Sequence, residues 1–176
     1  LAIGLARLGH EVTVVERSTP GPGPESFGID VRSVAITPAS KEFLASLDLW
    51  EETLAQPYRA MSIWEAHGVA NLDFDAKEMD QNCLGWIVEA KKIQLDIWKK
   101  LDSESVSKVT AGPTGLSILG DGIELEFEDE RLNFEFLIGA DGVNSFVRNQ
   151  LGIPLKKVSS HHHALASIVR SDSVHD

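Results

Sequence analysis

The sequence predicts an α/β fold that combines part of a parallel sheet with antiparallel strands. Two observations support this prediction. Near the N-terminus, apolar residues at helical spacing end at Gly9 and lead into a β-branched strand that ends at Glu16. Later in the chain, segments of alternating apolar and polar residues are separated by Gly, Pro and Asp turns, a pattern typical of hairpins and meanders.

The composition is that of a soluble globular protein with one substantial core, since 43% of the 176 residues are hydrophobic and 24% are charged. Acidic residues outnumber basic ones by 27 to 16, so we expect no nucleic-acid partner, because phosphate binding needs clustered Lys and Arg. Cys83 is the single cysteine. We therefore expect no internal disulfide and a cytoplasmic location. No apolar run approaches the ~20 residues that span a bilayer.

The order helix, glycine, strand and acid matches the second half of a βαβ dinucleotide-binding unit. In that unit the acid accepts hydrogen bonds from a ribose, about 20 residues after the first glycine of a Gly-rich turn. Counting back from Glu16 places those glycines before Leu1. We therefore expect the chain to be a piece of a longer protein. The alternative interpretation of Glu16 is an ordinary acid at the end of a strand.

A second charged candidate lies before the next helix. Thr37 and Pro38 are a good helix N-terminus, and the predicted helix continues through Leu47. Arg32 precedes it, where a guanidinium could meet a phosphate or a substrate carboxylate. The alternative is a surface ion pair with a neighbour such as Asp30.

The middle of the chain predicts antiparallel strands followed by a helix. Residues 58–74 alternate and are split by a His-Gly turn, which predicts a hairpin, and residues 84–88 predict one more strand. Residues 89–101 carry an apolar stripe at helical spacing. Gln94 lies close to the opposite edge of that stripe, as either a ligand contact or a solvated residue.

Four further strand segments precede a glycine-rich turn. They are residues 106–110, 116–119, 123–127 and 132–138. The first three are predicted to form a meander, and the fourth is predicted to return to the main sheet at Gly139. Residues 164–169 suggest a last strand. In the turn, Gly139 and Gly142 permit close backbone approach, since neither carries a Cβ. Asp141 places a carboxylate between them, suited to sugar hydroxyls.

With these residues placed, the sequence resembles the flavoprotein aromatic monooxygenases, and most closely their ubiquinone-biosynthesis hydroxylase branch. Four stretches carry the resemblance: residues 5–17, 30–36, 89–101 and 139–148. The first alone would fit many FAD or NAD proteins. Its combination with the last, which reads Gly-Ala-Asp-Gly-x-x-Ser-x-x-Arg, is far more specific to this group.

The resemblance implies a partial FAD-binding Rossmann-like domain with a three-stranded β-meander, and part of an antiparallel-sheet substrate domain. The FAD-binding domain would comprise residues 1–55 and 89–152, and the substrate domain residues 56–88 and 153–176. The family's N-terminal phosphate-binding glycines and its second, Gly-Asp-containing flavin motif are not in this sequence. We therefore expect these 176 residues alone to bind FAD weakly and to be inactive.

The resemblance also implies roles for particular residues. Glu16 would bind the adenosine ribose of FAD, with Arg17 beside the adenine. Arg32 would approach the flavin or the pyrophosphate, and Gln94 would contact the cofactor from its helix. Asp141 would lie near the pyrophosphate and ribityl chain with Gly142 alongside, whereas Arg148 would hold the geometry of the motif.

The implied activity is hydroxylation of an aromatic ring, in which NAD(P)H supplies the electrons and FAD activates oxygen and transfers it to the ring. The expected substrate is a ubiquinone precursor. A polyprenyl substrate would favour peripheral association with the inner membrane or with a biosynthetic complex. Two alternatives remain open, an FAD- or NAD-dependent reductase without oxygen insertion, and a non-catalytic truncated remnant. No metal is expected, because the run His161–His163 lacks the further ligands of a zinc site.

Overall fold

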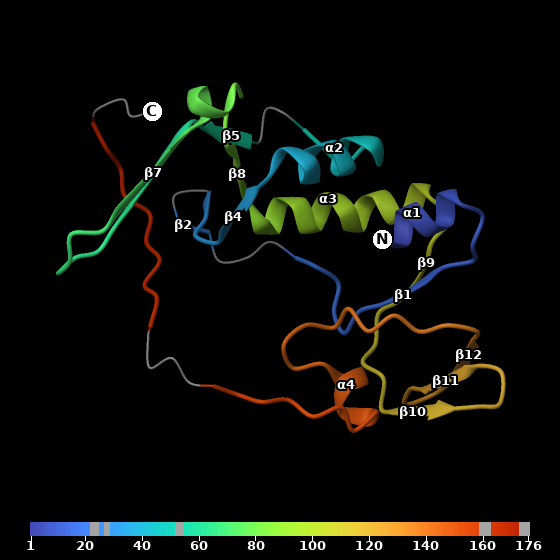
Figure 1. Ribbon diagram of the computed structural model, residues 1–176. Helices are drawn as coiled ribbons and strands as arrows, with labels where there is room; N and C mark the ends of the chain where they lie inside the picture. Colours follow the sequence, from blue (N-terminus) through green and yellow to red (C-terminus); the bar gives the residue numbers. More distant parts are fainter. Residues whose placement is uncertain (22–24, 27–28, 52–54, 159–162, 173–176) are drawn as a thin grey trace. The chain divides into compact units, whose positions relative to one another are not determined.

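The computed structural model describes residues 1–21, 25–26, 29–51, 55–158 and 163–172 (Figure 1). The chain folds into two compact units. Unit 1 holds residues 1–12, 20–107 and 165–176, and unit 2 holds residues 13–19 and 108–164. Helices and several antiparallel sheets are both present, which confirms the predicted mixed α/β class. The division into an FAD-binding domain and a substrate domain stays a prediction.

The described part of unit 1 contains the α-helices α1 (Ala2–Arg7), α2 (Pro38–Ser46) and α3 (Ala90–Ser103). The predicted start of α2 is confirmed, because the Thr37 hydroxyl accepts the N–H of Ser40 at 3.3 Å and Pro38 is the first helical residue. None of the helices in the described ranges has the length and hydropathy needed to cross a bilayer.

A three-stranded antiparallel sheet adjoins α3 in sequence. Its central strand is β8 (Gly85–Glu89), flanked by β4 (Ser33–Ile36) and β5 (Ala55–Tyr58). Gly85 permits the close approach of β4, because a Cβ there would lie 2.6 Å from the carbonyl oxygen of Ile36. A short ribbon of β2 (Glu25–Ser26) and β3 (Ile29–Asp30) precedes β4. This sheet therefore places the turn before β4 beside the start of α3.

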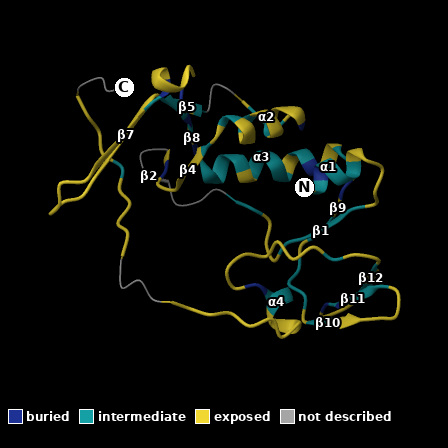
Figure 2. Ribbon diagram, viewed as in Figure 1, coloured by how far each residue is buried: buried dark blue, intermediate teal, exposed yellow. Residues whose placement is uncertain are grey.

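The predicted hairpin is confirmed as β6 (Ala60–Trp64) and β7 (Asn71–Asp75), which pair antiparallel and lead into the 3₁₀-helix η2 (Ala76–Met79). Met61 lies opposite Phe74 and Ile63 opposite Leu72, so one face of the hairpin is apolar. Figure 2 shows that the hairpin is exposed along most of its length.

The buried residues of unit 1 lie on its helices other than α2, on strands β3 and β8, and in the segments that follow α2, η2 and α3. The apolar ones are Ile3, Leu47, Ala76, Cys83, Val88, Leu101 and Val106. Beside them, the rings of Trp50 and Trp86 meet edge to face with centroids 5.6 Å apart, and the Lys41 ammonium lies 4.2 Å from the Trp86 centroid. Cys83 is thus a buried thiol.

The strand that ends at Glu16 is β1 (Thr13–Val15), and it pairs with β9 (Ser107–Val109). The Ser107 N–H donates to the Val12 carbonyl and the Glu16 N–H to the Val109 carbonyl. Both strands therefore run in the same direction, as predicted for β1. All three residues of β1 are half-buried rather than buried.

The β-meander is present but contains different strands from those predicted. It consists of β10 (Gly115–Ile118), β11 (Ile123–Glu126) and β12 (Arg131–Phe134). The first predicted meander strand became β9, which pairs with β1 instead, and the fourth predicted segment closes the meander. Local alternation predicts a strand but not its partner, because pairing depends on residues distant in sequence.

One predicted strand is shorter in the structure than expected, and another was wrong. The segment 132–138 forms a strand only to Phe134, and residues 164–169 are not a strand. Phe136 and Ile138 are 84% and 56% exposed. A strand needs a neighbour for its backbone N–H and C=O groups, and no ladder involves these residues in the portion of the chain that is described.

Candidate functional site

The Gly139–Arg148 loop lies in unit 2, and its last three residues form the start of the short helix α4 (Phe146–Gln150). Gly142 has a φ of +80°, a conformation that a residue with a Cβ rarely adopts. A Cβ on Gly139 would lie 3.2 Å from the side chain of Val147. The glycine spacing thus lets the loop turn tightly against the first turn of α4.

Polar side chains of the loop satisfy the amides at the start of α4. Asp141 Oδ2 accepts the Val147 N–H at 3.0 Å, and Ser145 Oγ accepts the Arg148 N–H at 3.0 Å. Desolvation opposes ionisation of Asp141, but hydrogen bonds from the Ser145 hydroxyl and from backbone amides hold its pKa below the ordinary value. Asp141 therefore carries a stable negative charge and organises its own loop.

The side chain of Arg148, which lies on α4, also contacts the backbone of this loop. Its Nη2 donates to the carbonyl oxygen of Val143 at 2.7 Å. Its Nε is buried and has no hydrogen-bond partner among the residues that the structure describes. The Ser-x-x-Arg spacing in the sequence thus corresponds to a helix cap and a backbone brace.

Glu16 and Arg17 follow β1 in unit 2. Glu16 is half-buried, and its Oε1 accepts the Arg17 N–H at 2.8 Å. The Arg17 side chain lies over Gly112, since a Cβ there would be 3.3 Å from Arg17 Cγ. An open hollow beside Gly112 is also lined by Phe127 and by the acidic run 128–130. Its acidic rim disfavours a phosphate, whereas its glycine and aromatic walls fit a neutral ring.

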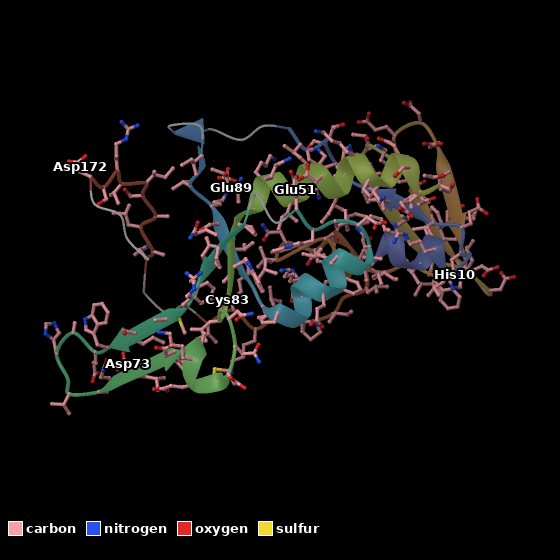
Figure 3. The ribbon with its side chains drawn as sticks, turned by 90° about the horizontal axis from the view of Figure 1, so that it is seen from above. His10, Glu51, Asp73, Cys83, Glu89 and Asp172 are labelled. Atoms are coloured by element: carbon pink, nitrogen blue, oxygen red, sulfur yellow. The ribbon has the colours of Figure 1, made fainter. Side chains whose placement is uncertain are left out.

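Arg32 lies in unit 1, in a turn with a buried acid. Asp30 Oδ1 accepts the Arg32 N–H at 2.9 Å and lies 3.7 Å from Arg32 Nε. The Asp30 N–H donates to Glu89 Oε2 at 2.9 Å, and Glu89 lies where β8 runs into α3 (Figure 3). The side chain of Arg32 is 68% exposed and that of Asp30 only 5%. The ion pair with Asp30 expected by the alternative interpretation is therefore present, but its carboxylate is buried and only its guanidinium side is exposed.

Gln94 is exposed on the first turns of α3, where its Oε1 accepts a weak hydrogen bond from Lys91 Nζ at 3.4 Å. The neighbouring Lys92 pairs with Asp96 at 2.9 Å, and that hydrogen bond raises the pKa of Lys92. The amide of Gln94 is thus accessible to a ligand.

The predicted site residues fall into three local groups. Unit 2 contains the pair Glu16 and Arg17 and the loop with Asp141 and Gly142, while unit 1 contains Arg32 and Gln94 near the start of α3. The sequence interpretation treated Asp30 only as a partner of Arg32 and did not weigh Glu89. The Asp-x-Arg spacing was the available signal for Asp30, because an Asp side chain commonly accepts the N–H two residues on.

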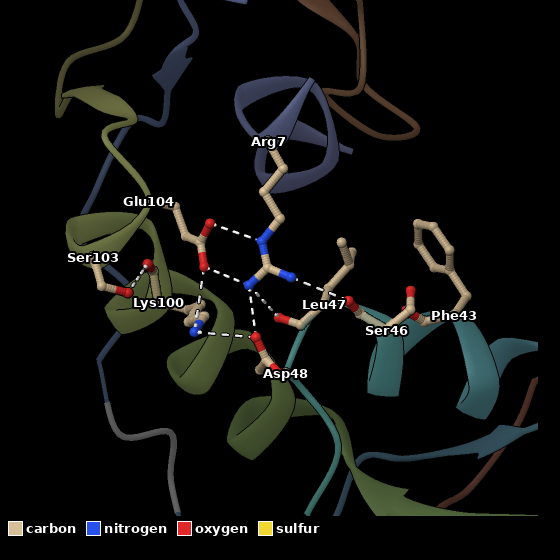
Figure 4. Close-up of polar contacts among 8 residues, drawn as sticks. All are labelled: Arg7, Phe43, Ser46, Leu47, Asp48, Lys100, Ser103 and Glu104. Atoms are coloured by element: carbon tan, nitrogen blue, oxygen red, sulfur yellow. Dashed lines mark hydrogen bonds and ion pairs between the residues drawn. The ribbon is translucent and has the colours of Figure 1, made fainter. Parts of the chain in front are cut away.

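A second arginine cluster, which the sequence did not indicate, joins the ends of three helices (Figure 4). Arg7 donates to both carboxylate oxygens of Glu104, at 2.8 and 2.6 Å, and to Asp48 Oδ2 at 2.7 Å. It also donates to two backbone carbonyls at the end of α2, those of Ser46 and Leu47. Lys100 lies 3.2 Å from Glu104. The contacts of Arg7 span 39 to 97 residues of sequence.

Within the described ranges, no group of three or more His, Cys, Asp or Glu side chains could hold a metal ion. Most of the run His161–His163 lies outside those ranges.

Comparison with known proteins gives consistent matches over most of the chain. A family model described as an FAD binding domain matches residues 1–175. The chain is 38% identical over 161 residues to 3-demethoxyubiquinol 3-hydroxylase of Escherichia coli (strain K12), covering 87% of this chain and 40% of that protein. It is 31% identical over 168 residues to the mitochondrial ubiquinone biosynthesis monooxygenase COQ6 of Xenopus tropicalis, covering 87% and 35%. The chain therefore spans 40% or less of the length of these two relatives.

Solved structures share the fold at lower sequence identity. Aklavinone-11 hydroxylase, in a ternary complex with FAD and aklavinone, matches with a TM-score of 0.61 at 22% identity, covering 86% of this chain and 32% of that one. The flavin-dependent monooxygenase PieE, in complex with FAD and substrate, matches with a TM-score of 0.67 at 19% identity, covering 89% and 30%.

Proposed function

Because this chain belongs to the FAD binding domain family, whose cofactor is FAD, we propose that the whole protein is an FAD-dependent monooxygenase. It hydroxylates an aromatic ring with oxygen and NAD(P)H, and its substrate is a ubiquinone precursor. The names of the two relatives, a 3-demethoxyubiquinol 3-hydroxylase and a ubiquinone biosynthesis monooxygenase, support this substrate class.

The observation that carries the proposal is the folded Gly139–Arg148 loop. Its glycines allow close approach of a ligand to the backbone, and its carboxylate and arginine are held by internal hydrogen bonds. Such a loop is preorganised, so little conformational entropy is lost when a ligand binds to it. A rigid loop with a stable negative charge suits the hydroxyl groups of a ribityl chain or ribose.

Residues of the chain would hold FAD in three places. Glu16 and Arg17 would bind the adenosine end, where a strand-end acid can accept hydrogen bonds from ribose hydroxyls. Arg32 supplies an exposed positive charge for an anionic part of the cofactor, and Gln94 supplies an amide from α3.

Asp141 and Gly142 would lie along the polar linker of FAD. When bound, FAD supplies the activation of oxygen and the transfer of one oxygen atom to the ring. The side chains of the protein bind the cofactor, orient the ring and exclude water.

The test is the reaction of the full-length protein with FAD, NAD(P)H, ¹⁸O₂ and a quinol precursor that carries a short prenyl chain. We expect flavin absorbance in the purified protein and one ¹⁸O atom in the product, measured by mass spectrometry. Oxidation of NAD(P)H without incorporation of ¹⁸O would instead support a reductase. A protein that binds no flavin and makes no product would support a non-catalytic remnant.

Peripheral association with a membrane, or with a biosynthetic complex, is a further part of this proposal. A polyprenylated precursor is located in the bilayer, so an enzyme that binds it must reach the membrane surface. The net charge of −11 gives no attraction to anionic lipid. We therefore expect co-sedimentation with vesicles that contain the prenylated substrate, little affected by anionic lipid content.

A further inference from the structure

The Asp30 carboxylate is buried beside Arg32 with one oxygen unused. Oδ1 accepts the Arg32 N–H and faces Arg32 Nε, but Oδ2 has no hydrogen-bond partner in the described part of the chain. Only 5% of the Asp30 side chain is exposed. A buried acceptor without a donor lowers stability. A contribution to folding therefore does not explain why this second oxygen is buried.

Asp30 is itself held in place from α3. Its N–H donates to Glu89 Oε2 at 2.9 Å, and the N–H of Ala90, the first residue of α3, donates to the Arg32 carbonyl at 3.0 Å. The turn of residues 30–32 is thus fixed to the helix start at both ends. The charged group that this turn exposes is the side chain of Arg32, at 68%.

We propose that Asp30 is a positioning residue that presents the Arg32 guanidinium to an anionic part of FAD. This inference rests on the proposed function. The Asp30 carboxylate faces Nε, which limits the rotation of Arg32 and leaves the two Nη groups of the planar fork to the ligand. Glu89, Asp30 and Arg32 thus form a relay, in which Glu89 fixes the backbone of Asp30 and Asp30 orients Arg32. Pre-ordering a long side chain raises affinity by reducing the entropy lost on binding.

The test is a double-mutant cycle on FAD affinity in the full-length protein. Flavin-free wild type, Asp30→Asn, Arg32→Ala and the double variant are titrated with FAD, and quenching of flavin fluorescence is measured. We expect Asp30→Asn to weaken FAD binding about tenfold, and to have no further effect once Arg32 is replaced. A role in folding alone would not depend on Arg32 in this way.

The thermal stability of the flavin-free proteins gives a second readout. Asn keeps a carbonyl oxygen that can accept the Arg32 N–H, and it replaces the unpaired, charged Oδ2 with an uncharged NH₂ group, which costs less to bury than a charge. We therefore expect the unfolding midpoint of Asp30→Asn to equal or exceed that of wild type. If this variant does not fold, Glu89→Ala tests the same relay, with weaker FAD binding expected only when Arg32 is present.

Asp75 offers a matched control. Its Oδ1 accepts the Lys77 N–H at 2.9 Å, the same two-residue turn followed by a cation, but it lies at the end of the β6–β7 hairpin. Asp75→Asn should leave FAD affinity unchanged.

Three outcomes would overturn the inference. In the first, Asp30→Asn, or Glu89→Ala where the former does not fold, binds FAD like wild type. In the second, the effect is equal with and without Arg32. In the third, wild type binds no FAD, and this outcome alone would also overturn the proposed function.

Discussion

Arg7 and Arg32 both lie in unit 1 and both have a carboxylate partner, but they differ in how completely their donors are used. Arg7 donates to Glu104, Asp48 and two backbone carbonyls, and its side chain is 32% exposed. Arg32 lies 3.7 Å from Asp30, and its side chain is 68% exposed. The first cluster joins helix ends, whereas the second leaves a guanidinium accessible next to an unpaired buried oxygen.

This difference separates an arginine that holds the fold from one that can hold a ligand. A guanidinium whose N–H groups all face protein acceptors has no donors left for a phosphate. A guanidinium in contact with one carboxylate oxygen retains most of its fork. Removing Arg7 should therefore affect stability, and removing Arg32 should affect cofactor binding.

The largest expected effect is that of Arg7→Ala on stability. The side chain of Glu104 is 12% exposed, so the substitution would leave a largely buried carboxylate with Lys100, 3.2 Å away, as the cation beside it. We expect the thermal unfolding midpoint of the full-length protein to fall by several degrees, measured by circular dichroism.

Arg131→Ala is the matched control for Arg7→Ala. Arg131 also contacts two carboxylates, those of Glu124 and Glu126, but its side chain is 62% exposed. Exposed ion pairs contribute little, so its midpoint should stay close to wild type. Equal losses for the two variants would contradict the distinction between the clusters.

The next effect in size is that of Arg32→Ala on FAD affinity. A hydrogen bond between charged groups contributes about 1.5–3 kcal/mol, so its loss should weaken FAD binding about ten- to hundredfold. The flavin-free midpoint should fall less than that of Arg7→Ala, because Arg32 Nε lies 3.7 Å from Asp30, whereas Arg7 donates hydrogen bonds of 2.8 and 2.6 Å to both oxygens of Glu104. Fluorescence titration and thermal unfolding measure the two quantities. A large loss of stability with unchanged affinity would reverse the assignment.

The Arg7 cluster should also give stability a dependence on acid. Hydrogen bonds from Arg7 lower the pKa of Glu104 from 4.5 to about 2; burial opposes this shift and Lys100 assists it. As the pH falls below about 4.5, the unfolded chain takes up a proton at Glu104 before the folded chain does. The stabilisation is therefore complete above pH 4.5 and is lost between about pH 4.5 and 2.

Glu104→Gln isolates this contribution. It should lower the unfolding midpoint at pH 7, and its difference from wild type should shrink as the pH approaches 3, measured at a series of pH values. A difference that stays constant with pH would show that the charge of Glu104 is not responsible.

Sequence patterns predicted the local elements and much less of what joins them. The cap of α2, the β6–β7 hairpin and α3 depend on neighbouring residues, and each was predicted. The Arg7 cluster was missed because its partners lie 41 and 97 residues away in sequence. No periodicity or spacing relates such residues. The pairing of β9 with β1, rather than with the meander, was missed for the same reason.

The candidate site shows the same limit. Asp141, Gly142 and Arg148 could be predicted as site residues because a single sequence motif contains them. Arg32 could be predicted too, but its neighbours include Glu89, 59 residues from Asp30. The unpaired oxygen of Asp30 could not be predicted at all, since it depends on burial by the surrounding chain.

The smallest expected effect is that of Asp48→Asn, and it tests whether exposure decides the contribution of a carboxylate to the Arg7 cluster. Hydrogen bonding to Arg7 lowers the pKa of Asp48, yet its side chain is 69% exposed, against 12% for Glu104. Asp48 has a φ of +55°, which Asn adopts readily. The substitution therefore removes the charge without backbone strain. Its midpoint should fall less than that of Glu104→Gln at pH 7, and the reverse order would mean that burial does not determine the strength of these contacts.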